Sequence, residues 1–384
     1  MEIGAIGWIG ILLGLSSVTM VVGRGKGTGR IALVLALAAT QIAVSIYFYN
    51  WALTNTTDAT TYYYDPYEFY GRGFGLSTQF VVWLVQSIKE TFGGSYLDFF
   101  LLFQATGTWG IVFVLKSIDE LFEQAGQQVP WQAVAILFLP GLHFWTAYIG
   151  KDGGLFLATA MAGWAAFSIW TRWPAFMFSI VIMIMLRPHI ALLALSAAAI
   201  ALVLDKRTAR ATRFALTSFA VVGLAVTVGT IRSTFEVDVT NADSVADFLA
   251  SRGETVQRIE TGEASGLSFP SRVFSLLFRP LFFDAQGALG LIASFENLVL
   301  VYLIGLIAVK FRWTKILFQR LFVIRYAAFF ALALTLLLSI VYYNVGLGLR
   351  QKMMMMPAII VMFSAVLATT RVVRPARKLR AQPA

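Results

Sequence analysis

Apolar residues gather in long runs separated by short polar links. A membrane-spanning helix needs about 20 predominantly apolar residues, and several runs approach or exceed that length. We therefore expect an all-α integral membrane protein with about eleven transmembrane helices, which form a single polytopic membrane domain over residues 1–384. The runs lie near 3–22, 31–54, 96–115, 132–149, 154–171, 174–186, 190–204, 214–231, 286–309, 324–343 and 357–370.

One polar interruption falls inside apolar sequence, at Arg187-Pro188-His189. Proline lacks a backbone N–H and disfavours helical backbone in the residue before it. The pattern leaves two interpretations open: two short helices that meet at the outer face, or one broken helix.

Basic residues predict the orientation, because cytoplasmic links of membrane proteins are rich in Lys and Arg. Eleven spans place four basic groups on the same side, which puts the amino terminus outside and the carboxyl terminus in the cytoplasm. The groups are Arg24, Lys26 and Arg30; Lys206, Arg207, Arg210 and Arg213; Lys310, Arg312, Lys315, Arg320 and Arg325; and the basic tail at 371–384.

Two long segments then face outward, at about 55–95 and 232–285. The second is acidic over 236–263, as suits a translocated segment. Each contains apolar residues at helical spacing, over 80–92 and 273–282. We expect both stretches to be amphipathic helices in the headgroup plane.

Composition supports the membrane class. Hydrophobic residues make up 58% and charged residues 13% of the chain, whereas soluble domains are about 25% charged. The net charge of +10 does not indicate nucleic-acid binding, since the basic residues flank apolar runs. With no cysteine and only His143 and His189, we expect no metal site and no cofactor.

Carboxylates, an arginine and several tyrosines follow the second run, between Asp58 and Gly73. Asp58 or Asp65 is a candidate general base for a sugar hydroxyl, and Arg72 is a candidate phosphate contact. The tyrosines offer flat faces to sugars or headgroups. The alternative is an interfacial aromatic belt with a solvated acidic loop.

Cations at the outer face are the second kind of candidate. Lys151 opposes the charge bias of that face and suits phosphate, unless it forms a surface pair with Asp152. Arg187, followed by His189, lies within apolar sequence, where an arginine must snorkel, pair with an acid or bind an anion. Arg279, Arg350 and Lys352 are further outer-face cations. The run Met353 to Met356 is interpreted as lipid-facing or packing surface.

Taken together, these cations predict a site for a lipid-attached phosphate or pyrophosphate, with Asp58 or Asp65 activating an acceptor hydroxyl. Leaving pyrophosphate gathers negative charge, which pre-placed cations stabilise. Arg187 is therefore assigned a catalytic as well as a binding role.

The order of short motifs resembles bacterial exopolysaccharide and O-antigen repeat-unit polymerases, and related membrane glycosyltransferases of the GT-C type. The likeness runs from about Asp58 to Pro357. It consists of the Asp/Tyr-rich first loop, Pro140-Gly141-Leu142-x-Phe144-Trp145 followed by Gly150-Lys151-Asp152, Arg187-Pro188-His189, Phe278-Arg279-Pro280, and Asn344-x-Gly346 followed by Arg350-Gln351.

The resemblance implies glycan transfer from a polyprenyl-(pyro)phosphate carrier to a lipid-linked or glycan acceptor, on the outer face of the cytoplasmic membrane. By likeness, Arg187, Arg350 and Lys151 hold carrier phosphates, and Asp65 or Asp58 is the first-loop acid. The chain departs from the GT-C pattern because that loop lacks an Asp-Asp or Glu-Asp pair.

Other expected partners are membrane lipids and further polysaccharide-assembly proteins, without nucleic acid. Two alternatives stay open. The first is a transporter or flippase of lipid-linked glycans. The second is a non-catalytic scaffold of a polysaccharide-secretion complex.

Overall fold

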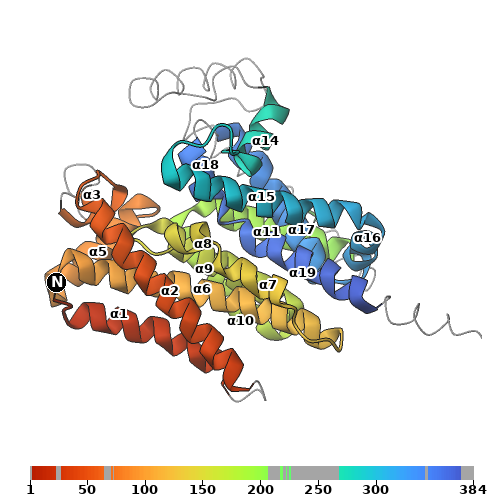
Figure 1. The fold of residues 1–384 in the computed structure, drawn as a ribbon, viewed down its shortest axis with the longest axis horizontal. Helices are drawn as coiled ribbons and strands as arrows, with labels where there is room; N and C mark the ends of the chain where they lie inside the picture. The colour runs from red at the N-terminus through yellow and green to blue at the C-terminus, as the bar shows by residue number, and fades with distance from the viewer. Residues whose placement is uncertain are drawn as a thin grey trace, which may run out of the picture. The chain divides into compact units, whose positions relative to one another are not determined.

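A computed structural model describes residues 2–22, 27–64, 71, 73–205, 217–218, 222, 225, 268–341 and 345–372. Within these residues every regular element is a helix (Figure 1). The described chain contributes to two compact units. Unit 1 comprises residues 1–120 and 129–188, and unit 2 comprises residues 121–128 and 189–384.

Among the described residues, five helical segments are long and apolar enough to cross a membrane: Thr28–Ala52, Tyr96–Gln124, Lys151–Leu186, Gly287–Val309 and Phe322–Ile340. A bent pair, Val345–Lys352 with Met356–Ala368, makes a sixth if it counts as one span. The chain bends by 59° between its two helices. The protein is therefore an all-helical, multi-pass membrane protein. The count of eleven spans and their orientation stay predictions, and the run 214–231 falls largely outside the described residues.

Unit 1 begins with a short apolar helix that packs on a long one. Helix α1 (Ala5–Leu15) continues into the 3-10 turn η1 (Ser16–Met20), and α6 spans Tyr96–Gln124. Glycines of α1 face α6 so closely that a methyl group on Gly10 would meet the backbone of Leu101. Small residues let two apolar helices approach in this way. The Asp98 carboxylate completes the contact by accepting the backbone N–H of Gly4 at 2.8 Å.

Helix α2 (Thr28–Ala52) leads to the short α3 (Asp58–Tyr64) and to α5 (Thr78–Phe92). The helix predicted over 80–92 is confirmed by α5. Its Gln86 side chain donates to the Tyr62 carbonyl at 2.6 Å, and Lys89 donates to the Tyr63 carbonyl at 2.8 Å. Because these carbonyls lie in the last turn of α3, where no helical partner exists, α5 fixes the end of α3. Partial burial lowers the pKa of Lys89.

The predicted fourth span, 132–149, is not one continuous helix. It contains α7 (Trp131–Ala135), the 3-10 turn η2 (Ile136–Phe138) and α8 (Pro140–Phe144). The interruption has a local cause, since Leu139, which precedes Pro140, is extended with ψ 125°. Buried His143 is held here by close contacts of its ring nitrogens with Gln41 Oε1 at 2.6 Å and the Leu137 carbonyl at 2.9 Å.

The passage Lys151–Leu186 is a hairpin. Helix α9 (Lys151–Ala165), the turn η3 (Ala166–Ser168) and α10 (Ile169–Leu186) follow one another, and α9 and α10 pack side by side (Figure 1). The chain leaves helical geometry at Arg172, which has φ −106° and ψ 16°. The runs predicted at 154–171 and 174–186 are thus two helices, although their common boundary is displaced toward η3.

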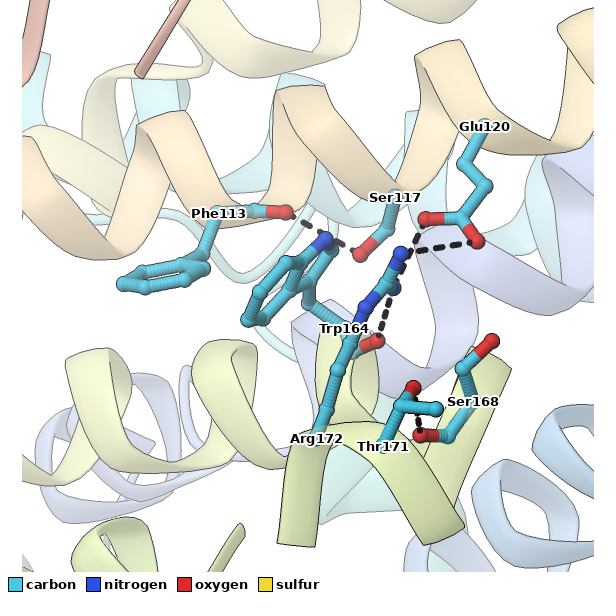
Figure 2. Close-up of polar contacts among 7 residues, drawn as sticks. All are labelled: Phe113, Ser117, Glu120, Trp164, Ser168, Thr171 and Arg172. Atoms are coloured by element: carbon cyan, nitrogen blue, oxygen red, sulfur yellow. Dashed lines mark hydrogen bonds and ion pairs between the residues drawn. The ribbon is translucent and has the colours of Figure 1, made fainter. Parts of the chain in front are cut away.

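An ion pair ties this hairpin to the last turns of α6 (Figure 2). The Arg172 guanidinium donates to both carboxylate oxygens of Glu120, at 2.8 and 3.2 Å, and to the Trp164 carbonyl at 3.0 Å. Its Cζ also lies 4.2 Å from the Trp164 ring centroid, within the range of a cation–π contact. Nearby, Arg30 of α2 pairs with Asp119. Two acids at the carboxyl end of α6, unfavourable there against the helix dipole, are each balanced by an arginine.

Unit 2 contains α11 (Pro188–Val203), α14 (Phe269–Phe278), α15 (Gly287–Val309), α16 (Phe311–Arg320), α17 (Phe322–Val341), α18 (Val345–Lys352) and α19 (Met356–Val372). Helix α10 ends at Leu186 and α11 begins at Pro188, which confirms the predicted break. Helix α14 confirms most of the amphipathic stretch predicted over 273–282. Met353 to Met356 are all buried, so this run is packing surface.

Candidate functional site

Two predicted site residues, Asp65 and Arg72, lie outside the described residues. Asp58 is the first residue of α3 and its side chain is exposed. The remaining predicted residues fall into two sets, one in each unit.

In unit 1, Lys151 and Arg187 belong to one polar cluster. Asp152, in the first turn of α9, follows Lys151 in the chain and contacts Arg187: its Oδ1 is 3.4 Å from Arg187 Nη2, and its Oδ2 accepts a hydrogen bond from the Tyr148 hydroxyl. The Asp152 side chain is 1% exposed and that of Arg187 is 10% exposed. The predicted alternative of a structural ion pair for Arg187 therefore has a specific partner.

The start of α5 supplies the hydroxyl groups of the same cluster. Lys151 Nζ donates to Thr78 Oγ1 at 2.8 Å and lies 3.5 Å from Ser77 Oγ. The Ser77 backbone N–H donates to the Met185 carbonyl at 2.7 Å, which ties this turn to the end of α10. Three chain segments, before α5, at the start of α9 and at the end of α10, thus meet at one place.

Backbone geometry at Ser77 is unusual. Its φ is 60° and its ψ is −125°, a conformation that residues with a Cβ rarely adopt. Ser77 precedes α5 and does not cap it with its side chain. Such strain persists only where surrounding contacts hold it, and it concentrates at functional positions.

The electrostatic character of the cluster favours anions. Among the described residues of the cluster, Lys151 and Arg187 are cations and Asp152 is an anion. Both α5 and α9 begin at this place, and helix amino termini direct backbone N–H groups and a partial positive charge outward. The Asp152 carboxylate holds Arg187 in place.

An aromatic wall supports the cluster from the protein interior. The Tyr148 ring stacks on Phe48 of α2, with ring centroids 4.8 Å apart and planes within 9°. Phe48 also contacts Phe144, at 4.6 Å between centroids. Tyr148, which donates to Asp152, is therefore fixed in orientation by α2 and α8.

Unit 2 holds the other predicted cations. Arg279 pairs with Asp284, and Lys352 is 2% exposed with its Nζ in contact with Asn297 Oδ1. The Leu277 carbonyl lies 3.5 Å from the same Nζ. Lys352 is thus an interior residue of unit 2. Arg350 and His189 are partly exposed residues of α18 and α11.

Sequence reasoning missed Ser77, Thr78 and Tyr148. A signal existed for the first two, since Ser and Thr directly before an amphipathic repeat are typical of a helix start. Tyr148 had no separate signal, because its role depends on the fold that brings Phe48 beside it.

Within the part of the chain that the structure describes, His, Asp and Glu side chains do not gather in groups of three or more that could hold a metal ion. The chain matches no protein-family model, no curated protein and no solved structure.

Proposed function

We propose that this protein is a membrane glycosyltransferase, a polysaccharide polymerase that uses a polyprenyl-(pyro)phosphate-linked donor on the outer face of the cytoplasmic membrane. In this proposal the cluster of Lys151, Arg187 and Thr78 binds the carrier phosphate. The acceptor is a lipid-linked or growing glycan, and a first-loop acid, Asp58 or Asp65, activates its hydroxyl.

The observation that carries the proposal is the position of Lys151 at the start of α9 and of Arg187 directly after α10, where Asp152, the neighbour of Lys151 in the chain, contacts Arg187. A lysine ammonium serves as a point charge for phosphate, and a guanidinium offers a planar pair of donors. A lipid-linked phosphate has its anionic group beside its hydrocarbon chain, which matches cations placed at the ends of a membrane hairpin. The Thr78 hydroxyl, already in contact with Lys151, adds a neutral donor.

The chemistry that follows is electrostatic. The bond between the anomeric carbon of the donor sugar and the carrier phosphate oxygen breaks, while the acceptor hydroxyl oxygen bonds to that carbon and its proton passes to the base. Negative charge grows on the leaving phosphate, so Arg187 and Lys151 stabilise the transition state more than the ground state.

The test compares Arg187→Ala with Arg172→Ala in cells that make the polymer, at matched membrane levels of each variant. Arg172 is a matched control, because it is also paired with an acid and belongs to the same hairpin. We expect Arg187→Ala to abolish polymer and to accumulate single lipid-linked units, whereas Arg172→Ala keeps polymer in proportion to folded protein.

The location of the accumulated units separates the alternatives. Units that an externally added glycosidase can reach support the polymerase. Units confined to the cytoplasmic leaflet point to a flippase. Normal polymer in Arg187→Ala would leave Arg187 with a structural role alone and favour a scaffold.

A further inference from the structure

Helix α16 presents an exposed face of unusual composition. Its exposed residues are Phe311, Arg312, Lys315, Ile316 and Gln319. At 100° per residue these positions fall within an arc of about 140°, so they form one face. Phe311 is 64% exposed and Ile316 is 39% exposed, so large apolar side chains flank the two cations on that face.

The position of α16 in the chain places it at a membrane surface. It directly follows α15 and directly precedes α17, and both are candidate spans. A link between two consecutive spans lies at one face of the bilayer, and its ten residues are too few to cross. Between Lys310 and Arg325 the sequence contains five basic residues and no acid.

Side-chain contacts hold α16 firmly on unit 2. The buried Arg325 guanidinium donates to the carbonyls of Phe318 and Gln319, at 3.3 and 3.1 Å, in the last turn of α16. The same side chain donates to the Ala201 carbonyl at 3.0 Å and to Asp205 at 2.9 Å. It thereby satisfies carbonyls that have no partner within α16.

Two further contacts fix the inner side of the helix. Thr314 Oγ1 donates to the Ile307 carbonyl of α15 at 2.9 Å, and the Phe318 ring meets Phe329 of α17 at 5.6 Å between centroids. Because the inner side is used for packing, the direction of the outer face is set by the fold. Arg312 and Lys315 are therefore displayed in a constant orientation.

We propose that the outer face of α16 binds acidic phospholipids of the membrane leaflet at which it lies. Arg312 and Lys315 contact the headgroup phosphates, and Phe311 and Ile316 enter the boundary between headgroups and acyl chains. The partner is a lipid surface, because a solvated basic face has no use for exposed phenylalanine and isoleucine side chains, whereas headgroups above acyl chains match both. This inference is independent of the proposed glycan transfer.

Native mass spectrometry of the purified full-length protein tests it, with phosphatidylglycerol and phosphatidylcholine as probes. We expect wild type to prefer phosphatidylglycerol and the double variant Arg312→Gln, Lys315→Gln to lose that preference. The expected loss is about fivefold for each cation removed. Both residues are exposed, so the variant should fold.

Two controls keep the result specific. The exchange Arg312→Lys, Lys315→Arg keeps both charges and should keep the preference. The variant Lys378→Gln, Arg380→Gln removes the same net charge from the basic tail, and should also keep it. An equal loss in the tail variant would show attraction by net charge and overturn the proposal. Displacement of phosphatidylglycerol by inorganic phosphate would show an anion site instead of a lipid surface, and would overturn it as well.

Discussion

The guanidinium of Arg187, the residue directly after α10, lies 3.4 Å from the carboxylate of Asp152, in the first turn of α9. This contact joins the start of α9 to the residue after α10. It also sets the orientation of Arg187, which interrupts the apolar sequence between α10 and α11. The pair has a structural consequence, and the proposed phosphate binding by Arg187 adds a functional one that substitutions can separate.

Arg187→Ala should destabilise unit 1 by about 3–5 kcal/mol, because it leaves the buried Asp152 carboxylate without its cation. Asp152→Asn in the same chain should recover part of this loss, since the uncompensated charge is then gone. The measurement is the free energy of unfolding of the purified protein for both single variants and the double variant. Losses that simply add would argue that the two side chains are not coupled.

Polymer synthesis should not follow stability in these variants. If Arg187 binds carrier phosphate, the double variant regains stability but not polymer synthesis. Polymer that returns together with stability would assign Arg187 to the hairpin alone.

Ser77→Gly should stabilise the protein by about 1 kcal/mol, because glycine adopts φ 60° without a clash and the native strain is relieved. Ser77→Ala keeps the strain and removes the hydroxyl. Thermal unfolding of the two variants checks the prediction. A Ser77→Gly protein less stable than wild type would mean that the hydroxyl contact with Lys151 outweighs the backbone strain.

Gly10→Ala should destabilise by at least about 1–3 kcal/mol, since its methyl group would meet the backbone of Leu101, which cannot move aside as a side chain can. Gly305→Ala is the matched control in another apolar helix. Nothing lies within 4 Å of a Cβ at Gly305, and alanine favours helix by about 1 kcal/mol over glycine. The free energy of unfolding in detergent should fall for Gly10→Ala and rise for Gly305→Ala. Equal changes in the two variants would exclude close packing of α1 on α6.

Arg325→Ala should destabilise unit 2 far more than Asp205→Asn. The guanidinium side chain is 3% exposed and has four acceptors, and its loss leaves the buried Ala201 carbonyl without this donor, at about 1–3 kcal/mol, along with the partly buried carbonyls of Phe318 and Gln319. The Asp205 side chain is 32% exposed and can turn to water. Hydrogen exchange of the α16 amides gives the readout, with faster exchange expected in Arg325→Ala. Unchanged exchange there would show that other contacts hold α16.

Several features of the fold were readable from local sequence. The break between α10 and α11 follows from proline chemistry at Arg187-Pro188, and the helix α5 follows from apolar spacing over 80–92. The failure at 132–149 is instructive, because hydropathy alone indicates a span there. Pro140 interrupts the helix in this run, and the buried His143 side chain contacts Gln41 and the Leu137 carbonyl. These contacts of His143 can be seen only in the folded chain.

The sequence indicated which kinds of residue form the candidate site, but not which residues come together in it. Lys151 and Arg187 were predicted as cations that oppose the charge bias of an expected outer face. Thr78 was not recognised as a partner of Lys151, since the two are far apart in sequence, and Asp152 was considered as a partner of Lys151 and not of Arg187. Lys352 was predicted with the same outer-face cations, but it is a buried residue of unit 2 in contact with Asn297.

The sequence by itself determined the solvent of this protein and the helical class of its elements, because long apolar runs with few charges are stable only in hydrocarbon, where helices satisfy their own backbone. Tertiary structure alone decided which charges meet. The pairing of Arg187 with Asp152, and of Arg325 with Asp205 and the end of α16, depends on which helices pack together. That choice is made by contacts between distant segments, whose geometry no local pattern contains.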